Sequence, residues 1–150
     1  MTRDKILKEL APCGLDCSRC ASFKDGKISK QSKQLLEMLD GYSRMATKMS
    51  TFFEPFKEYE SFENILAFFA EAKCGGCRGN SKAGMPGCAA KSCVTENNID
   101  FCGECSNFPC DKNNYNKNLR GRWIQNGEMI KKDGLQAYYE TQKAKKRYLY

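Results

Sequence analysis

Cysteine is the residue type in this chain that most clearly indicates a chemical role. Ten of its 150 residues are cysteines, and the chain has no histidine. Three cysteine pairs are separated by two residues, a spacing at which two sulfur atoms bind one ion while the intervening amides donate to the thiolates. One such pair says little, but three in one chain indicate metal ligation. The four cysteine groups are Cys13, Cys17 and Cys20; Cys74 and Cys77; Cys88 and Cys93; and Cys102, Cys105 and Cys110.

Two other uses of cysteine explain this pattern less well. A disulfide framework is typical of secreted chains, whereas this N-terminus lacks the apolar stretch of a secretory signal and the sequence has no Asn-x-Ser/Thr acceptor site. Isolated buried cysteines, acting as small apolar residues, would account for two or three of the ten but not for their grouping. We therefore expect a cytoplasmic protein in which all ten cysteines are candidate metal ligands.

The absence of histidine also limits the metal. Sites built on three histidines, on two histidines with a carboxylate, or on a Rieske centre are excluded, which leaves all-sulfur coordination of zinc or of an iron–sulfur cluster. The group Cys13, Cys17 and Cys20 matches the cluster spacing of radical S-adenosylmethionine enzymes, but the chain lacks the length and the strand–helix alternation of their barrel. The sequence favours two or more zinc ions, with an iron–sulfur cluster as the alternative.

The spacing suggests, but does not fix, which sulfurs share an ion. A pair, a ten-residue loop and a second pair would place Cys74, Cys77, Cys88 and Cys93 around one ion. A second site would then combine Cys17 and Cys20 with Cys102 and Cys105, leaving Cys13 and Cys110 as spare thiols. A bridged arrangement of the remaining six cysteines around two ions is the alternative.

The sequence predicts that helices and loops position these candidate ligands. Residues 1–10 predict a short amphipathic helix before a metal loop at 11–22. Apolar residues at three- and four-residue steps predict two amphipathic helices within the segment 31–72, divided near residues 50–55, with their methionine and aromatic stripes in the core. Residues 74–113 are rich in turn-forming residues and predict loops ordered by metal, with room for a short β-hairpin. Helices broken at Asp133-Gly134 are expected in the segment 114–147.

Together these segments predict one domain, residues 1–150, of an α-rich, metal-stabilised class. The formal charge of +7 counts every thiol as neutral; eight thiolates and two zinc ions would add eight negative and four positive charges and leave +3. That balance is only mildly basic. No apolar run approaches the length of a transmembrane helix, so no membrane partner is expected.

Three motifs resemble a known family when taken in order. They are Ala11-Pro12-Cys13-Gly14-Leu15-Asp16-Cys17-Ser18-Arg19-Cys20, Cys74-Gly75-Gly76-Cys77-Arg78, and Phe101-Cys102-Gly103-Glu104-Cys105-Ser106-Asn107-Phe108-Pro109-Cys110. They resemble the DUF3795 family of small, cysteine-rich microbial proteins, over roughly residues 11 to 139. The resemblance implies zinc ligation by the matching cysteines and no assigned reaction.

Three functions are compatible with the pattern. Closed four-sulfur sites leave no coordination position for a substrate, which favours a binding or scaffold module with structural zinc. A thiol-redox or iron–sulfur protein would use the spare thiols, with Asp16 and Glu104 as acid–base groups, although capping of loop backbone explains those two carboxylates better. Nucleic-acid binding would use two basic clusters: Lys143, Lys145, Lys146, Arg147 and Tyr148, and Arg120, Arg122 and Trp123.

Overall fold

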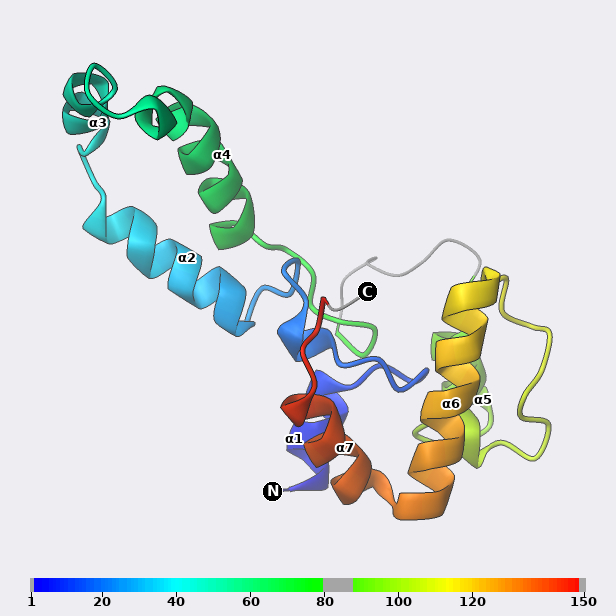
Figure 1. Cartoon of the computed structure of the whole chain (residues 1–150). Coiled ribbons are helices and arrows are strands. Elements are labelled where there is room, and N and C mark those ends of the chain that lie inside the picture. The colour runs from blue at the N-terminus through cyan, green and yellow to red at the C-terminus, as the bar shows by residue number, and fades with distance from the viewer. Residues whose placement is uncertain (1, 80–87, 149–150) are drawn as a thin grey trace. The chain divides into compact units, whose positions relative to one another are not determined.

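A computed structural model gives the fold for residues 2–79 and 88–148 (Figure 1). The chain divides into two compact units. Unit 1 combines Met1–Ser18 with Gly75–Tyr150, and unit 2 is Arg19–Cys74. Most of the predicted metal loop and the cysteine-rich region therefore belong to unit 1, and the predicted helical segment belongs to unit 2.

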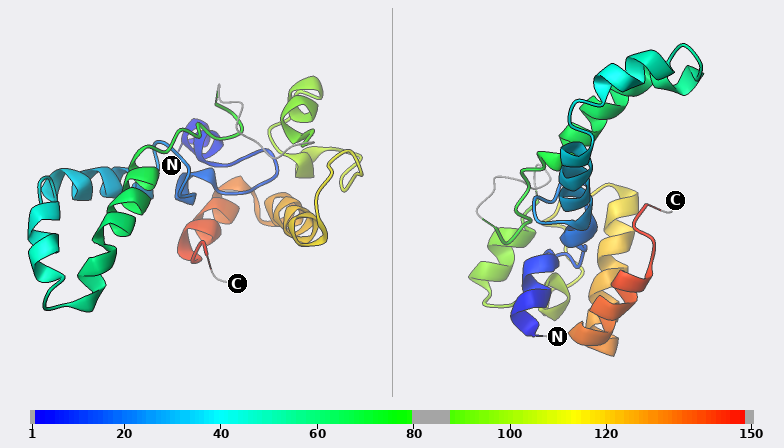
Figure 2. Two further views of the ribbon diagram at one scale, coloured as in Figure 1. Left: turned by 90° about the horizontal axis from the view of Figure 1, so that it is seen from above. Right: turned by 90° about the vertical axis from the view of Figure 1, so that its left-hand side faces the viewer.

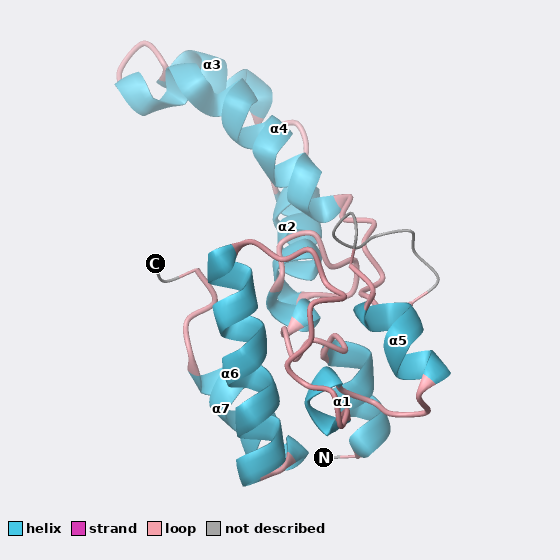
Figure 3. Ribbon diagram, turned by 90° about the vertical axis from the view of Figure 1, so that its right-hand side faces the viewer, coloured by secondary structure: helices cyan, strands magenta, loops and turns pink. Residues whose placement is uncertain are grey.

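The described residues form helices and loops, which confirms the α-rich class (Figure 3). Unit 1 contains α1 (Arg3–Glu9), α5 (Ala90–Glu96), the 3-10 helix η3 (Cys102–Glu104), α6 (Lys117–Asp133) and α7 (Leu135–Ala144). Unit 2 contains α2 (Lys27–Met38), α3 (Ser43–Met49), the 3-10 helix η2 (Glu54–Glu58) and α4 (Tyr59–Ala70), and a further 3-10 helix, η1 (Cys17–Arg19), lies where the chain leaves unit 1.

The anticipated β-hairpin is not seen in the described part of residues 74–113, and the stretch 80–87 lies outside the described residues. Across the described residues, extended pairing is limited to two isolated bridges, Leu10 with Asp16 and Phe23 with Cys74. The cysteine-rich region instead contains α5, which the sequence did not predict. None of the helices in residues 2–79 and 88–148 combines the length and the apolar character needed to cross a bilayer.

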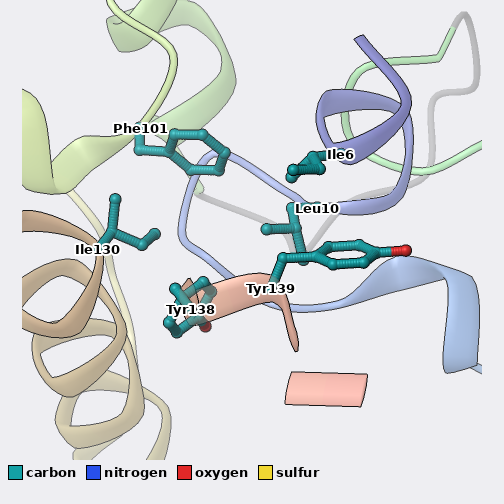
Figure 4. Packing of buried hydrophobic residues seen from close by; sticks show 6 residues of the cluster. All are labelled: Ile6, Leu10, Phe101, Ile130, Tyr138 and Tyr139. Carbon is teal, nitrogen blue, oxygen red and sulfur yellow. The ribbon is translucent and has the colours of Figure 1, made fainter. Parts of the chain in front are cut away.

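The core of unit 1 joins its first and last helices to the cysteine-rich region. Its buried members come from α1 and the residue that ends it, from the segment before η3, and from α6 and α7 (Figure 4): Ile6, Leu10, Phe101, Ile130, Tyr138 and Tyr139. The predicted break between the two C-terminal helices is confirmed, because Gly134 ends α6 and begins α7 with a φ of +81°. This core fixes α6 and α7 against the loop that carries the first cysteines.

Unit 2 is built on the side-by-side packing of α2 and α4 (Figure 2). Leu66 of α4 is buried, while α2 buries Ser29 and Ser32, and the Ser29 hydroxyl donates to the carbonyl of Ala70 over 3.2 Å. The predicted first helix was misplaced: α2 begins at Lys27, and a turn containing Gly41, with a φ of +74°, separates it from α3.

The expectation that the methionine and aromatic stripes form a core is wrong for four of their large members. Met38 keeps 75% of its surface exposed and Ile65 keeps 58%, and Met45 and Phe62 are also exposed. The other large members are half-buried, or buried in the case of Leu66. In α2 the fully buried residues are Ser29 and Ser32, so the most buried face of that helix is not the one that carries Met38.

Candidate metal centre

Most of the sulfur atoms are gathered in unit 1. Eight cysteines lie there and two, Cys20 and Cys74, lie in unit 2; none of the ten forms a disulfide bond. In unit 2 the amide of Cys74 donates to the carbonyl of Ser22 and the amide of Lys24 donates to the carbonyl of Cys74, each over 3.0 Å. This pairing brings the segment just after Cys20 alongside Cys74.

The loop that follows α1 is held by α6 and α7. The Tyr138 hydroxyl donates to the carbonyl of Gly14 over 2.6 Å, and the Asn126 side-chain amide lies 3.5 Å from the carbonyl of Cys13. Gly14 has a φ of +83°, and a Cβ there would lie 2.7 Å from the Cβ of Asn126. Only glycine fits this turn without strain, so the position of Cys13 depends on Gly14.

Cys13 is buried inside a cluster that contains Trp123, with other cysteines partly buried around it. Burial, opposed only in part by a backbone hydrogen bond, raises the pKa of the Cys13 thiol to about 12. The neighbouring sulfurs of Cys88, Cys102 and Cys17 act in the same direction. Without a cation nearby, this environment therefore favours the neutral thiol.

Cys17 lies beside Cys77, from a part of the chain sixty residues later. A hydrogen bond between the two side chains is the largest cause of a raised pKa at Cys17, followed by burial. Gly76, which precedes Cys77, has a φ of +77°, a backbone conformation that favours glycine.

A second group of sulfurs lines one small cavity. The lining comes from α5, from η3 and the loop after it, and from α6, and it includes Cys93, Cys102, Cys105, Cys110 and Trp123. The cavity volume is about 20 Å³. Burial raises the pKa of the Cys102 thiol to about 11; the nearby Trp123 side chain acts in the opposite direction, and Cys93, Cys110 and Cys88 raise it further.

Aromatic rings enclose these sulfurs on the α6 side. The Phe108 and Trp123 rings meet edge to face with centroids 4.8 Å apart, and the Tyr115 and Trp123 centroids are 5.7 Å apart. The Tyr115 hydroxyl lies 3.1 Å from the Cys88 sulfur. Burial first, and this contact second, raise the pKa of Tyr115, so the phenol stays protonated and is available to donate to a thiolate.

The turn that carries Cys102 and Cys105 sits directly on α6. A Cβ on Gly103 would lie 2.6 Å from the backbone oxygen of Gly127, so glycine at this position permits the close approach of the turn to the helix. Glu104 closes the same turn by accepting from the amides of Asp100 and Phe101 over 2.8 and 3.0 Å.

Asp16 and Glu104 act as loop caps, as the sequence favoured over acid–base catalysis. Asp16 is buried and accepts from the amide of Ser18 over 3.0 Å and from the ammonium group of Lys143. Lys143 also pairs with Glu9 over 2.6 Å. These contacts fix the loop before Cys17 to the end of α7.

Basic residues near the cysteines have separate structural contacts. Arg78 donates to the carbonyls of Leu10 and Asp100 and lies 5.0 Å from the centre of the Phe101 ring. Burial lowers its pKa. Lys91 donates to the carbonyl of Gly79 over 3.3 Å, whereas Lys112 lines the cavity beside the sulfurs.

The described sulfurs approach one another without forming a finished coordination shell. Among residues 2–79 and 88–148, no group of three or more cysteine or acidic side chains already has the spacing that holds a metal ion. Cys17 lies beside Cys77, and Cys93 lines a cavity with the last three cysteines. Five of the cysteines belong to the cluster that contains Trp123: Cys13, Cys17, Cys77, Cys102 and Cys110.

Several residues that shape this centre were not identified from the sequence. Trp123 had been assigned to a nucleic-acid patch, but it is 1% exposed and packs among the cysteines. Tyr115 and Gly127 gave no signal beyond an aromatic residue near the cysteines and a glycine inside a predicted helix. A tryptophan that occurs once, in a helix just after the last cysteine, was the available hint.

Comparison with known proteins gives one result. No curated protein and no solved structure matches the chain. A family model matches residues 9–115, which include all ten cysteines and end before α6. Because the match spans well over half of the chain, the protein belongs to the family described as "Protein of unknown function (DUF3795)".

Proposed function

We propose that the chain is a zinc-binding protein in which cysteine thiolates hold two or more structural zinc ions, and that it acts as a binding or scaffold module. The observation that carries the proposal is the gathering of eight cysteines in unit 1, none of them in a disulfide bond. Five of them pack in the cluster that contains Trp123: Cys13, Cys17, Cys77, Cys102 and Cys110. A divalent ion explains their convergence because it offsets the repulsion among thiolates.

Zinc would supply order rather than reactivity at such sites. A shell of four thiolates leaves no position for water or substrate, unlike a catalytic zinc with three protein ligands. Within residues 2–79 and 88–148, the backbone of the cysteine-bearing loops lacks regular secondary structure outside α5 and the short 3-10 helices. Metal binding would then contribute directly to the free energy of folding of unit 1.

The surroundings of the thiols favour this proposal over thiol-redox chemistry. A reactive cysteine is exposed and has a lowered pKa, whereas Cys13, one of the two candidate spare thiols, is buried with its pKa raised to about 12. Asp16 and Glu104 cap loop backbone instead of facing a substrate pocket.

The structure of the two basic clusters supports nucleic-acid binding less than their sequence does. Lys143 pairs with Glu9 and Asp16, Arg120 pairs with Asp111 over 2.8 Å, and Trp123 is buried where no base can stack on it. Exposed cations and accessible rings are what such binding requires.

Metal removal tests the proposal. Protein purified without oxygen is treated with a strong chelator, and helix content and hydrodynamic radius are followed by circular dichroism and light scattering. We expect unit 1 to lose structure on chelation and to regain it when zinc is returned. A chain that keeps the same helix content, radius and thermal midpoint with and without chelator would overturn the proposal, and stoichiometric iron with visible absorption would replace zinc with a cluster.

A further inference from the structure

We infer that unit 2 pairs with unit 2 of a second copy of this chain, in an antiparallel dimer where the tip of each copy enters a cavity at the root of the other. The tip is the turn at residues 50–53, after α3. The root is the end of α4 with the segment that follows it, residues 68–74. This inference goes beyond the proposed zinc sites, most of whose candidate ligands lie in unit 1.

The tip and the root lie at opposite ends of the α2–α4 pair (Figure 1). At the root end, Ser29 near the start of α2 donates to the carbonyl of Ala70, the last residue of α4. At the tip end, the ring of Tyr42 contacts the ring of Tyr59, the first residue of α4, with centroids 5.6 Å apart. The two ends are therefore separated by the length of α4, about 18 Å for its 12 residues.

The tip displays a large apolar side chain on a turn fixed by hydrogen bonds. Phe52 keeps 81% of its surface exposed. The amides of Phe52 and Phe53 donate to the carbonyl of Met49 over 3.0 and 2.8 Å. The Thr51 hydroxyl donates to the carbonyl of Lys48 over 2.8 Å. Because the backbone is already ordered, a ring at this position loses little conformational entropy on docking, which suits an interface anchor.

A continuous apolar track joins the tip to the root along one side of α4. Four ring contacts, with centroids 5.6–6.5 Å apart, lead from the tip to α4: Phe53 to Phe56, Phe56 to Tyr42, Tyr42 to Tyr59, and Tyr59 to Phe62. Exposed apolar side chains then recur at every third residue of the helix to its last turn. The exposed members of this track are Phe52, Phe53, Phe62, Ile65 and Phe68. An apolar stripe of this width on a helix normally packs against another element.

The root contains the cavity that the tip would enter. Its volume is about 340 Å³, and Phe68, the last member of the track, is part of its wall. The remaining lining residues also belong to unit 2: Ser22, Glu71, Ala72, Lys73 and Cys74. A cavity of about 150 Å³ holds a benzene molecule, so this one has room for the side chain of a phenylalanine.

The charges beside the two contact surfaces favour a second copy as the occupant. Lys48 and Glu54 flank the turn that carries Phe52, and Glu54 also pairs with Lys57 over 3.1 Å. Glu71 and Lys73 line the cavity. Each end thus brings one cation and one anion to the contact, so opposite charges pair across it. Unit 2 has nine Lys or Arg residues and eight Asp or Glu residues, so two copies do not repel each other through net charge.

A two-fold axis would form both tip-to-root contacts at once, because the separation of tip and root is the same in each copy. The exposed members of the track leave roughly 600 Å² uncovered, at about 200 Å² for each large side chain. Each partner in an interface of standard size contributes roughly 450 Å² of apolar surface. The track is therefore large enough for a stable dimer, in which the two α2–α4 pairs form the layers of a four-helix arrangement.

Substitution at the exposed ends of the track tests the dimer. Protein is purified without oxygen, and sedimentation velocity over a range of concentrations gives the Kd for dimerisation. We expect Phe52→Asp and Phe68→Asp each to raise this Kd about a thousandfold, because one buried anchor is worth about thirtyfold and the two-fold axis removes two. Tyr148→Asp, which changes an exposed aromatic residue of unit 1, is the control and should leave the Kd unchanged. An equal Kd for all four proteins would refute the interface.

Mixing the two variants distinguishes tip-to-root pairing from any other dimer. The Phe52→Asp chain keeps an intact root and the Phe68→Asp chain keeps an intact tip, so the mixed dimer retains one of the two contacts. With one chain isotope-labelled, native mass spectrometry should detect the mixed dimer at concentrations where neither variant dimerises alone. Tip-to-tip or root-to-root pairing gives no such rescue, and its absence would refute the inference.

Hydrogen–deuterium exchange of the unmodified chain covers a variant that fails to fold. Raising the protein concentration through the Kd should slow exchange at the tip and at the root together. Slower exchange at only one of them would overturn the inference. A chain that stays monomeric at every concentration would also overturn it and would assign the track to unit 1 or to another protein. Neither result changes the metal content, so the zinc proposal stands or falls separately.

Discussion

Replacing Gly103 with alanine should destabilise the protein through a contact between the cysteine-bearing turn and α6. A Cβ at this position would lie 2.6 Å from the backbone oxygen of Gly127 and 2.8 Å from its Cα, whereas ordinary contact begins at 3.4 Å. The turn must therefore move by about 0.8 Å away from a helix backbone that has no side chain to yield. Overpacking of this kind costs about 1–3 kcal/mol.

Part of that loss is offset in the unfolded chain. Alanine gives the unfolded chain less conformational freedom than glycine does. Where the folded backbone tolerates alanine, this raises the free energy of unfolding by about 0.4–1 kcal/mol. We expect a net loss of about 1–2 kcal/mol in the free energy of unfolding. Because Cys102 and Cys105 flank the substituted residue, zinc should also be released at a lower chelator concentration.

Gly121→Ala is the matched control because it makes the same change within α6, where a Cβ would meet nothing within 4 Å. Alanine in an exposed helix interior stabilises by up to about 1 kcal/mol relative to glycine. Urea denaturation at equal zinc content should separate the two variants by about 2–3 kcal/mol, with wild type between them. Equal stability of the two variants, or a Gly103→Ala protein more stable than wild type, would refute the close-approach reasoning.

Two further predictions concern the residues that hold the first loop. Tyr138→Phe removes the donor to the carbonyl of Gly14 and leaves that buried group unpaired, so the free energy of unfolding should fall by about 1–2 kcal/mol; unchanged urea midpoints would contradict it. Burial works against the ionised form of Glu9, yet hydrogen bonds from Lys143 and Tyr139 lower its pKa below the ordinary 4.5. A carboxylate whose pKa is lower in the folded than in the unfolded state stabilises the fold at pH values above its unfolded-state pKa. That stabilisation is lost as the pH falls through its folded-state pKa. The stability advantage of wild type over Glu9→Gln should therefore shrink on acidification below about pH 4.5, and a difference independent of pH would exclude the assigned interaction.

The elements with strong local signals could be predicted from the sequence. The first helix and the two C-terminal helices follow from apolar periodicity, and Gly134 marks the break between them because it adopts a φ that other residues avoid. The roles of Asp16 and Glu104 as caps follow from their places in turns.

The errors arose where local pattern and packing disagree. Met38 and Ile65 have helical spacing, but α2 buries serines against α4, so apolar spacing did not identify the buried face. The helix α5 was missed because glycine, proline and cysteine dominate the average composition of residues 74–113 and mask the short run Ala90–Glu96. Composition averaged over forty residues conceals a seven-residue helix.

The spacing of the cysteines in the sequence does not predict which of them lie close together in the fold. The turn that carries Cys102 packs on α6, and that contact requires a glycine at position 103, because a Cβ there would meet the backbone of Gly127, twenty-four positions later. Sequence separation carries no information about such an approach. Which cysteines lie close together therefore could not be predicted from their spacing.

The metal content of the intact chain tests the central claim most directly. Protein purified without oxygen is analysed by native mass spectrometry together with elemental analysis, which gives the mass of the folded species and the identity of its metal in one experiment. We predict two or more zinc ions per chain, each accompanied by the loss of thiol protons. A compact, monodisperse chain whose mass equals that of the polypeptide alone would contradict the claim that sulfur-bound zinc organises unit 1.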